Sequence, residues 1–162
     1  MKHRRLLLAL VALVFGSSVA QQSVPSPTPV YTAVTLKRTL EIISGAKREI
    51  WLLTPTLRNP EVYKALRSRI QSGVILRLLI ANRAGYTGLE VNLARAANVD
   101  ARWLKEKFGS AMLVVDDRAA IISPILSGVA NPGQSIEISR PEVVAPMAAT
   151  IKQLFQAAKR VR

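Results

Sequence analysis

The spacing of apolar residues between positions 34 and 80 alternates between a helical period and short continuous runs. The helical stretches place apolar side chains three or four residues apart. Gly45 follows the first stretch and suits the end of a helix, and Asn59-Pro60-Glu61 precedes the second and suits the start of a helix. The continuous apolar runs, 50–53 and 74–80, predict buried strands. The order helix, strand, helix, strand favours a parallel sheet with crossover helices.

The rest of the chain predicts shorter elements and one hairpin. In order these are a loop at 81–88, a short helix at 89–98, strands at 101–104, 112–115 and 119–122, a loop at 124–134, a strand at 135–139 and a helix from 141 to 155. Asp116-Asp117-Arg118 joins two of the strands, as in a β-hairpin. Together the elements predict one α/β domain whose mixed, largely parallel sheet is flanked by helices.

The first 32 residues predict export and a spacer. Three basic residues precede the apolar stretch 6–15, and Ser18-Val19-Ala20 offers a cleavage site, so 1–20 has the pattern of a signal peptide. The alternative is an uncleaved membrane anchor, but the apolar stretch is shorter than the roughly 20 residues that a spanning helix needs. Residues 21–32 are rich in Pro and Ser and predict a linker, which leaves 33–162 as the domain. We expect export to a bacterial periplasm or envelope, or secretion.

Composition narrows the chemistry of this domain. The chain has no cysteine, and its one histidine, His3, lies in the predicted leader. Disulfides, Ser-His-Asp triads and the common His-containing zinc sites are therefore excluded once the leader is removed, and we expect no cofactor and no metal. The formal net charge is +13, and loss of the leader leaves +10. Such an excess attracts polyanions, among them nucleic acid and anionic phospholipid.

Four segments of the domain have the order and spacing of a known family. They are Ala46 to Pro55 (AKREIWLLTP), Gly73 to Leu79 (GVILRLL), Met112 to Ile122 (MLVVDDRAAII) and Ile136 to Ile138 (IEI). With the C-terminal helix, they resemble one half of a phospholipase D-like protein of the single-half, nuclease type. The resemblance implies an α/β fold and phosphodiester chemistry. In that chemistry a His-x-Lys-x-x-x-x-Asp motif supplies the histidine that attacks phosphorus and a lysine that holds the phosphate oxygens.

The chain departs from this catalytic motif. With Asp116 as the motif aspartate, the histidine position falls on Gly109 and the lysine position on Ala111. The family's Gly-Ser-x-Asn segment is then missing from residues 123–126. The resemblance makes Glu137 the acid that would orient the histidine, but no histidine is there. Without an imidazole, the family mechanism lacks its nucleophile and its general acid.

The alternative alignment does not restore the motif. With Asp117 as the aspartate, the two positions fall on Ser110 and Met112. Ser110 could replace the nucleophile only with a neighbouring base, for which Lys105 and Lys107 are the candidates. The favoured interpretation is a small residue that leads into a buried strand. A metal site at the two adjacent aspartates is also disfavoured, because neighbouring strand residues point to opposite faces, whereas aspartates at turns accept backbone N–H hydrogen bonds.

Three functional hypotheses from different classes follow. The first is a catalytically inactive phospholipase D-like domain that binds polyanions, either nucleic acid or phospholipid headgroups. Its candidate binding residues are Arg77, Arg83, Lys105, Lys107 and Arg118. The second is an envelope interaction module that forms a homodimer or pairs with a partner carrying the other half. The third is a residual phosphodiesterase. The missing histidine and lysine favour the first.

Overall fold

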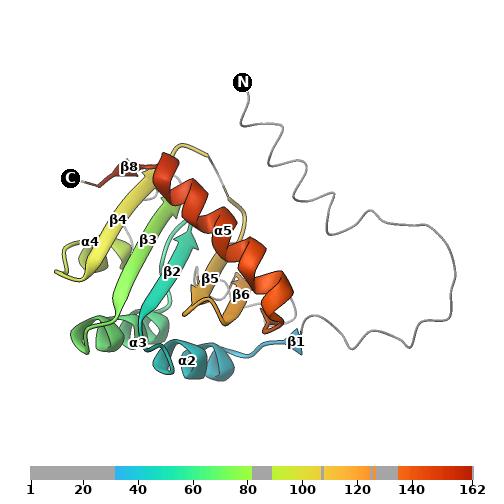
Figure 1. Cartoon of the computed structure of the whole chain (residues 1–162). Helices are drawn as coiled ribbons and strands as arrows, with labels where there is room; N and C mark the ends of the chain where they lie inside the picture. The colour runs from blue at the N-terminus through green and yellow to red at the C-terminus, as the bar shows by residue number, and fades with distance from the viewer. Residues whose placement is uncertain (1–31, 82–88, 107, 125, 127–134, 162) are drawn as a thin grey trace, which may run out of the picture.

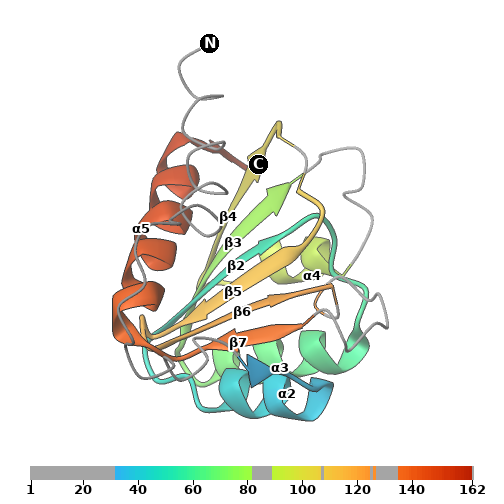
Figure 2. The ribbon, with the colours of Figure 1, turned by 90° about the vertical axis from the view of Figure 1, so that its right-hand side faces the viewer.

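Helices cover both faces of a single β-sheet (Figures 1 and 2). The computed structural model describes residues 32–81, 89–106, 108–124, 126 and 135–161. Within these residues the sheet has eight strands in the order β1-β7-β6-β5-β2-β3-β4-β8. Helices α2, α3 and α4 lie on one face, and α5 crosses the other face.

All the helices and strands expected from the sequence are present, with ends that differ by a few residues. The strands are β1 (Thr32–Ala33), β2 (Glu49–Thr54), β3 (Ile75–Ala81), β4 (Val99–Leu104), β5 (Ala111–Val115), β6 (Ala119–Ser123), β7 (Ile136–Ile138) and β8 (Lys159–Arg160). The helices are α2 (Leu36–Ser44), α3 (Pro60–Gln71), α4 (Glu90–Ala94) and α5 (Pro141–Ala157). The two-residue strands β1 and β8 were not expected.

Parallel pairing is confined to β2, β3 and β4, which form two parallel pairs. Strand β5 joins the other side of β2 in the antiparallel sense, and β6 and β7 continue in that sense. The prediction of a mixed sheet flanked by helices is confirmed. Its parallel part is smaller than expected, because a hairpin, β5–β6, and not a further crossover unit, extends the sheet beyond β2.

Successive side chains along the strands pack into two separate apolar cores, one on each face of the sheet. In β2, Leu52 packs toward α2 and α3, whereas Trp51 and Leu53 pack toward α5. The first core includes the buried face of α3, which the sequence predicted: Val62, Leu66 and Ile70. The second core includes the buried face of α5: Val144, Ala148, Ile151 and Phe155. The sheet is therefore covered by apolar contacts on both sides.

Side-chain caps explain where α2 and α3 begin. Thr35 Oγ1 accepts a hydrogen bond from Arg38 N at 3.2 Å at the start of α2. Asn59 Oδ1 accepts from Glu61 N at 3.0 Å and from Val62 N at 3.1 Å at the start of α3. Each cap satisfies backbone donors that have no partner inside the helix. The predicted start of α3 is confirmed.

The described part of the chain begins inside the predicted linker. Strand β1 starts at Thr32 and pairs with β7, so the sheet begins one residue before position 33, where the domain was predicted to start. The predicted signal peptide, 1–20, lies outside the described residues, as do 21–31 of the linker, the loop residues 82–88 and most of the loop at 124–134. Among the described helices, none has the length and apolar character needed to span a membrane.

Candidate functional site

The β5–β6 turn ties the hairpin to the first residues of β2. Asp116 is 6% exposed, and its carboxylate accepts hydrogen bonds from three consecutive backbone amides. Oδ2 accepts from Lys47 N at 2.8 Å, and Oδ1 accepts from Arg48 N and from Glu49 N, both at 2.9 Å. Burial by itself raises the pKa of Asp116, but the three amide bonds and the Arg48 charge outweigh it and lower the pKa below its usual value. The predicted role of a turn aspartate that accepts N–H bonds is confirmed.

The neighbouring carboxylate of Asp117 has a different partner. Lys152 Nζ on α5 donates to both Asp117 oxygens, at 2.7 and 2.9 Å. Both aspartates have a positive φ, 51° for Asp116 and 57° for Asp117, and Arg118 N donates to Val115 O. They are therefore the two left-handed residues of a tight hairpin turn, which asparagine and aspartate tolerate better than most residues. The expectation that they alternate across a strand is wrong, but they do engage separate partners.

Sheet register decides which motif positions lie near Glu137. Ile121 pairs with Glu137, and Ala111 pairs with Ser123 on the neighbouring strand. Ala111 and Ile121 both belong to the core under α2 and α3, whereas Met112 packs against the α5 core. Ala111 therefore shares a face with Glu137, and Met112 does not. This favours the alignment with Asp116 as the motif aspartate.

Two buried serines adjoin this position. Ser123 and Ser135 are 0% and 1% exposed, and their Oγ atoms lie 2.6 Å apart in a hydrogen bond. Gly109 and Ser110 precede β5 and are exposed. Among the described side chains, none forms a hydrogen bond with Ser110. Lys105 is exposed after β4, and Lys107, the other candidate base, lies outside the described residues.

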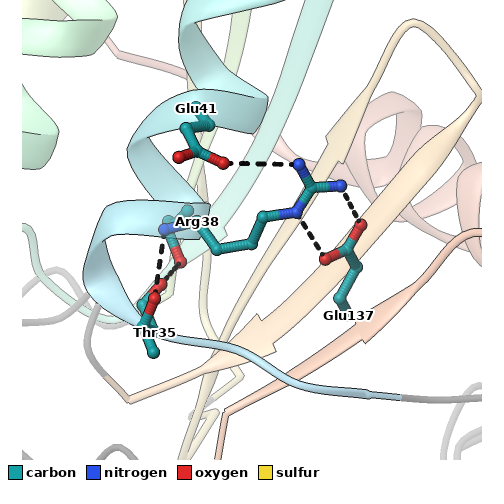
Figure 3. A network of polar contacts seen from close by, with 5 residues as sticks. Thr35, Arg38, Glu41 and Glu137 are labelled. Atoms are coloured by element: carbon teal, nitrogen blue, oxygen red, sulfur yellow. Dashed lines mark hydrogen bonds and ion pairs between the residues drawn. The ribbon is translucent and has the colours of Figure 1, made fainter.

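The carboxylate of Glu137 is held by an arginine that the sequence did not single out (Figure 3). Arg38 on α2 donates from Nε to Oε2 at 2.9 Å and from Nη2 to Oε1 at 2.8 Å. Arg38 also contacts Glu41, one turn along α2, at 3.4 Å. The Glu137 side chain is 13% exposed and that of Arg38 is 51% exposed. The hydrogen bonds to Glu137, and then its charge, raise the pKa of Arg38 above its usual value.

Of the five basic residues predicted to bind polyanions, the three that the structure describes do not form one cluster. Arg77 lies under α5, where its Nη1 is 3.3 Å from Asp100 Oδ2 and its guanidinium is 6.0 Å from the Trp51 ring centroid. Lys105 follows the carboxyl end of β4. Arg118 lies in the β5–β6 turn. Because Val115 pairs with Ile50 near the start of β2, this turn lies at the amino ends of the parallel strands, whereas Lys105 lies at their carboxyl ends. Arg83 and Lys107 lie outside the described residues.

The fold is similar to that of a solved phospholipase D family member and to that of a second protein, NucT. Nuc from Salmonella typhimurium, described as a phospholipase D family member, has a TM-score of 0.64 and 17% identity, over 82% of this chain and 95% of that chain. NucT from Helicobacter pylori has a TM-score of 0.65 and 10% identity, over 78% of this chain and 90% of that chain. The resemblance inferred from the sequence is thereby confirmed as a likeness of fold.

A third similar structure is TrmBL2, an archaeal chromatin protein whose structure is described as showing a novel mode of DNA binding. Its TM-score is 0.61 at 18% identity, over 99% of this chain and 62% of that chain, so the present chain spans less than two thirds of TrmBL2. A scan against protein-family models finds no match, and a comparison with curated proteins finds none.

Proposed function

We propose that this chain is a non-catalytic phospholipase D-like domain that binds nucleic acid. The observation that carries the proposal is the bidentate pair between Arg38 and Glu137. In the family resemblance, Glu137 stands where an acid would orient a histidine, and here that acid is held by an arginine instead. The positions of the histidine and the lysine are Gly109 and Ala111, which carry no nucleophile and no cation.

The chemistry supports the loss of catalysis. Attack on a phosphodiester needs a nucleophile near its working pKa and an acid for the leaving group. The chain has no histidine beyond His3. Ser123, which pairs with Ala111 across the sheet, has its hydroxyl in a hydrogen bond with that of Ser135. A serine also needs an adjacent base to become a nucleophile.

Three observations favour nucleic acid as the ligand. The chain has 23 basic residues against ten acidic ones. Several exposed basic side chains, on α3 and α4 among others, form no ion pair with a described residue. The chromatin protein with a similar fold is described as binding DNA, and the likeness covers 99% of this chain. We propose further that residues 1–20 direct export, so the ligand would be met outside the cytoplasm.

Fluorescence anisotropy of a labelled oligonucleotide, titrated with the purified chain at several salt concentrations, tests the proposal. We expect saturable binding that weakens as salt rises, because Lys and Arg contacts to phosphates release counterions. A flat trace at low salt contradicts the proposal and favours a protein or lipid partner. A slow later fall of the signal shows cleavage and favours a residual phosphodiesterase. A salt-insensitive dimer in sedimentation experiments, without binding, favours the interaction module.

A further inference from the structure

A shallow groove of about 520 Å³ runs between α3 and α4. Its floor is apolar, because Ile70 and Leu93 are 5% and 2% exposed and belong to the core beneath. Its rim is polar and carries Arg67 and Gln71 from α3, Asn92 from α4, and Arg95, the residue that follows α4. All four rim residues are exposed. None of the degenerate motif positions lines this groove, so it is a separate feature of the molecule.

Helical spacing builds both walls. On α3, Arg67 and Gln71 lie four residues apart and therefore on the same stripe of the helix, with Tyr63 one turn earlier. On the other wall, Asn92 and Arg95 lie three residues apart. The buried residues of the two helices fix them to the core, so the arginines project from two supported elements.

The charge of the groove distinguishes it from other basic positions. No carboxylate lines it, and neither Arg67 nor Arg95 forms an ion pair with a described residue. By contrast, Arg38, Arg77 and Arg102 each lie within 3.5 Å of a carboxylate oxygen. Two uncompensated guanidinium groups flank amide donors from Gln71 and Asn92. This set matches a ligand that carries negative charge and many acceptor oxygens.

A neighbouring groove gives an internal contrast. The groove between α2 and α3 has a similar volume, about 510 Å³, but its lining includes Glu41 and Glu61 beside a single basic residue, Lys37. Two carboxylates repel a phosphate chain, so this groove is unsuited to a polyanion. The α3–α4 groove is the one of the two whose charge fits.

We infer that Arg67 and Arg95 clamp the phosphodiester backbone of single-stranded nucleic acid in the α3–α4 groove. This inference rests on the proposed function and locates its binding surface. Guanidinium groups are suited to phosphate because their planar fork donates two parallel hydrogen bonds. The groove is open to solvent, so a strand can enter it, and Tyr63, half-buried on the α3 wall, offers a ring on which a base can stack.

The test compares two double variants that remove equal charge. Arg67→Ala/Arg95→Ala removes the clamp, and Lys37→Ala/Lys47→Ala removes two exposed cations outside the groove. With a labelled single-stranded oligonucleotide, we expect the first variant to lose about 10-fold in affinity. Its slope of log K against log salt should become shallower by about 1.4, because each lost phosphate contact on a single strand removes about 0.7. The second variant should change affinity by less than about 3-fold, since its charges act only at a distance.

Additional variants and a second ligand distinguish the possible results of this experiment. Arg67→Lys/Arg95→Lys keeps the charge but loses the fork, and we expect an intermediate affinity. Circular dichroism should show unchanged folding, because the substituted side chains are exposed. Equal losses in both alanine variants overturn the inference and leave nucleic-acid binding in place. Absence of binding by the unaltered chain overturns both. Loss of binding to phosphatidylglycerol vesicles with unchanged oligonucleotide binding assigns the groove to lipid and also overturns the inference.

Discussion

On the α5 face of the sheet, Arg77 and Arg102 from the strands and Lys152 from α5 itself each contact a carboxylate and an aromatic ring. The exposed side chains of Lys64 and Arg67 on α3, and of Arg95 just after α4, contact neither a carboxylate nor an aromatic ring among the described residues. The two faces of the sheet thus differ in what their basic residues do. On the α5 face they take part in packing, whereas the side chains of Lys64, Arg67 and Arg95 are exposed to solvent.

The α5 face is built around two aromatic rings. Trp51 and Phe155 pack edge to face, with centroids 5.3 Å apart and an interplanar angle of 84°. Arg102 lies 4.3 Å above the Phe155 ring and donates to Phe155 O at 3.1 Å. Lys152 lies 5.5 Å from the Trp51 ring while it binds Asp117. Cations in such positions stabilise the docking of α5 through cation–π and ion-pair contacts.

This difference shows why net charge is a poor guide to a binding surface. Arg77, within the family-like segment Gly73 to Leu79, was a candidate for polyanion binding. In the fold it pairs with Asp100, which also contacts Arg102 at 3.5 Å. Arg67 and Arg95 were not candidates, since nothing in the sequence says that their helices face one groove.

Truncation of Phe155, which disrupts the packing of α5, should cause the largest loss of stability. Phe155→Ala removes a ring that is 4% exposed, and we expect a loss of about 3–5 kcal/mol in the free energy of unfolding. Phe155→Leu keeps most of the apolar volume and should lose about 1 kcal/mol. Urea denaturation followed by circular dichroism measures both.

The comparison of faces gives this prediction a second readout. At temperatures where Phe155→Ala remains folded, its oligonucleotide affinity should match that of the unaltered chain. The reason is that α3 and α4, between which the groove lies, cover the face of the sheet opposite to α5 (Figure 2). A folded variant with much weaker binding would place the ligand under α5 and would contradict the separation of roles.

Removal of the Asp116 carboxylate should have the next largest effect. Asp116→Ala leaves three backbone amides of residues 47–49 without their acceptor, and we expect a loss of about 3 kcal/mol. Asp117→Ala is the matched control in the same turn. Its ion pair to Lys152 is partly exposed, so the loss should be about 1 kcal/mol.

The lowered pKa of Asp116 fixes the sign of a pH dependence. Because the pKa is lower in the folded chain than the ordinary value of 3.8, the stabilisation is present above about pH 3.8 and is lost as the pH falls through the folded-state pKa. Urea midpoints of the unaltered chain should therefore decrease more steeply below about pH 3.8 than those of Asp116→Ala. Parallel curves for the two proteins would show that the carboxylate does not carry this linkage.

Most of the fold could be predicted because its signals are local. The Asn59 cap, the buried stripe of α3 and the Asp116-Asp117 hairpin turn all arise within a few residues of sequence. The edge strands β1 and β8 could not be predicted. They have two residues each, without an apolar pattern, and pair with strands about 100 and 60 residues away in the chain (Thr32 with Glu137, Lys159 with Trp103).

The site was less predictable, because its contacts join distant segments. The role of Glu137 depends on Arg38, which lies 99 residues earlier, and no spacing rule connects them. The turn role of Asp116 was foreseen, but the amides that it binds belong to the segment before β2, 67 to 69 residues away. The α3–α4 groove requires the packing of two helices on one sheet face, which periodicity alone does not specify.

The smallest expected effect concerns the exception to the comparison, the ion pair of Arg38 and Glu137 on the α2 face. Glu137 is the more buried partner, at 13% against 51% exposed, so Arg38→Ala should destabilise by about 1 kcal/mol and Glu137→Gln by about 0.5 kcal/mol. A double-mutant cycle in urea should give a coupling of about 0.5–1 kcal/mol.

Neither variant should gain phosphodiesterase activity against a chromogenic phosphodiester, since release of Glu137 supplies no nucleophile. Turnover that appears in Arg38→Ala and disappears in Arg38→Ala/Glu137→Gln would mean that Arg38 masks a working acid, and the chain would then be an inhibited enzyme and not a binding domain.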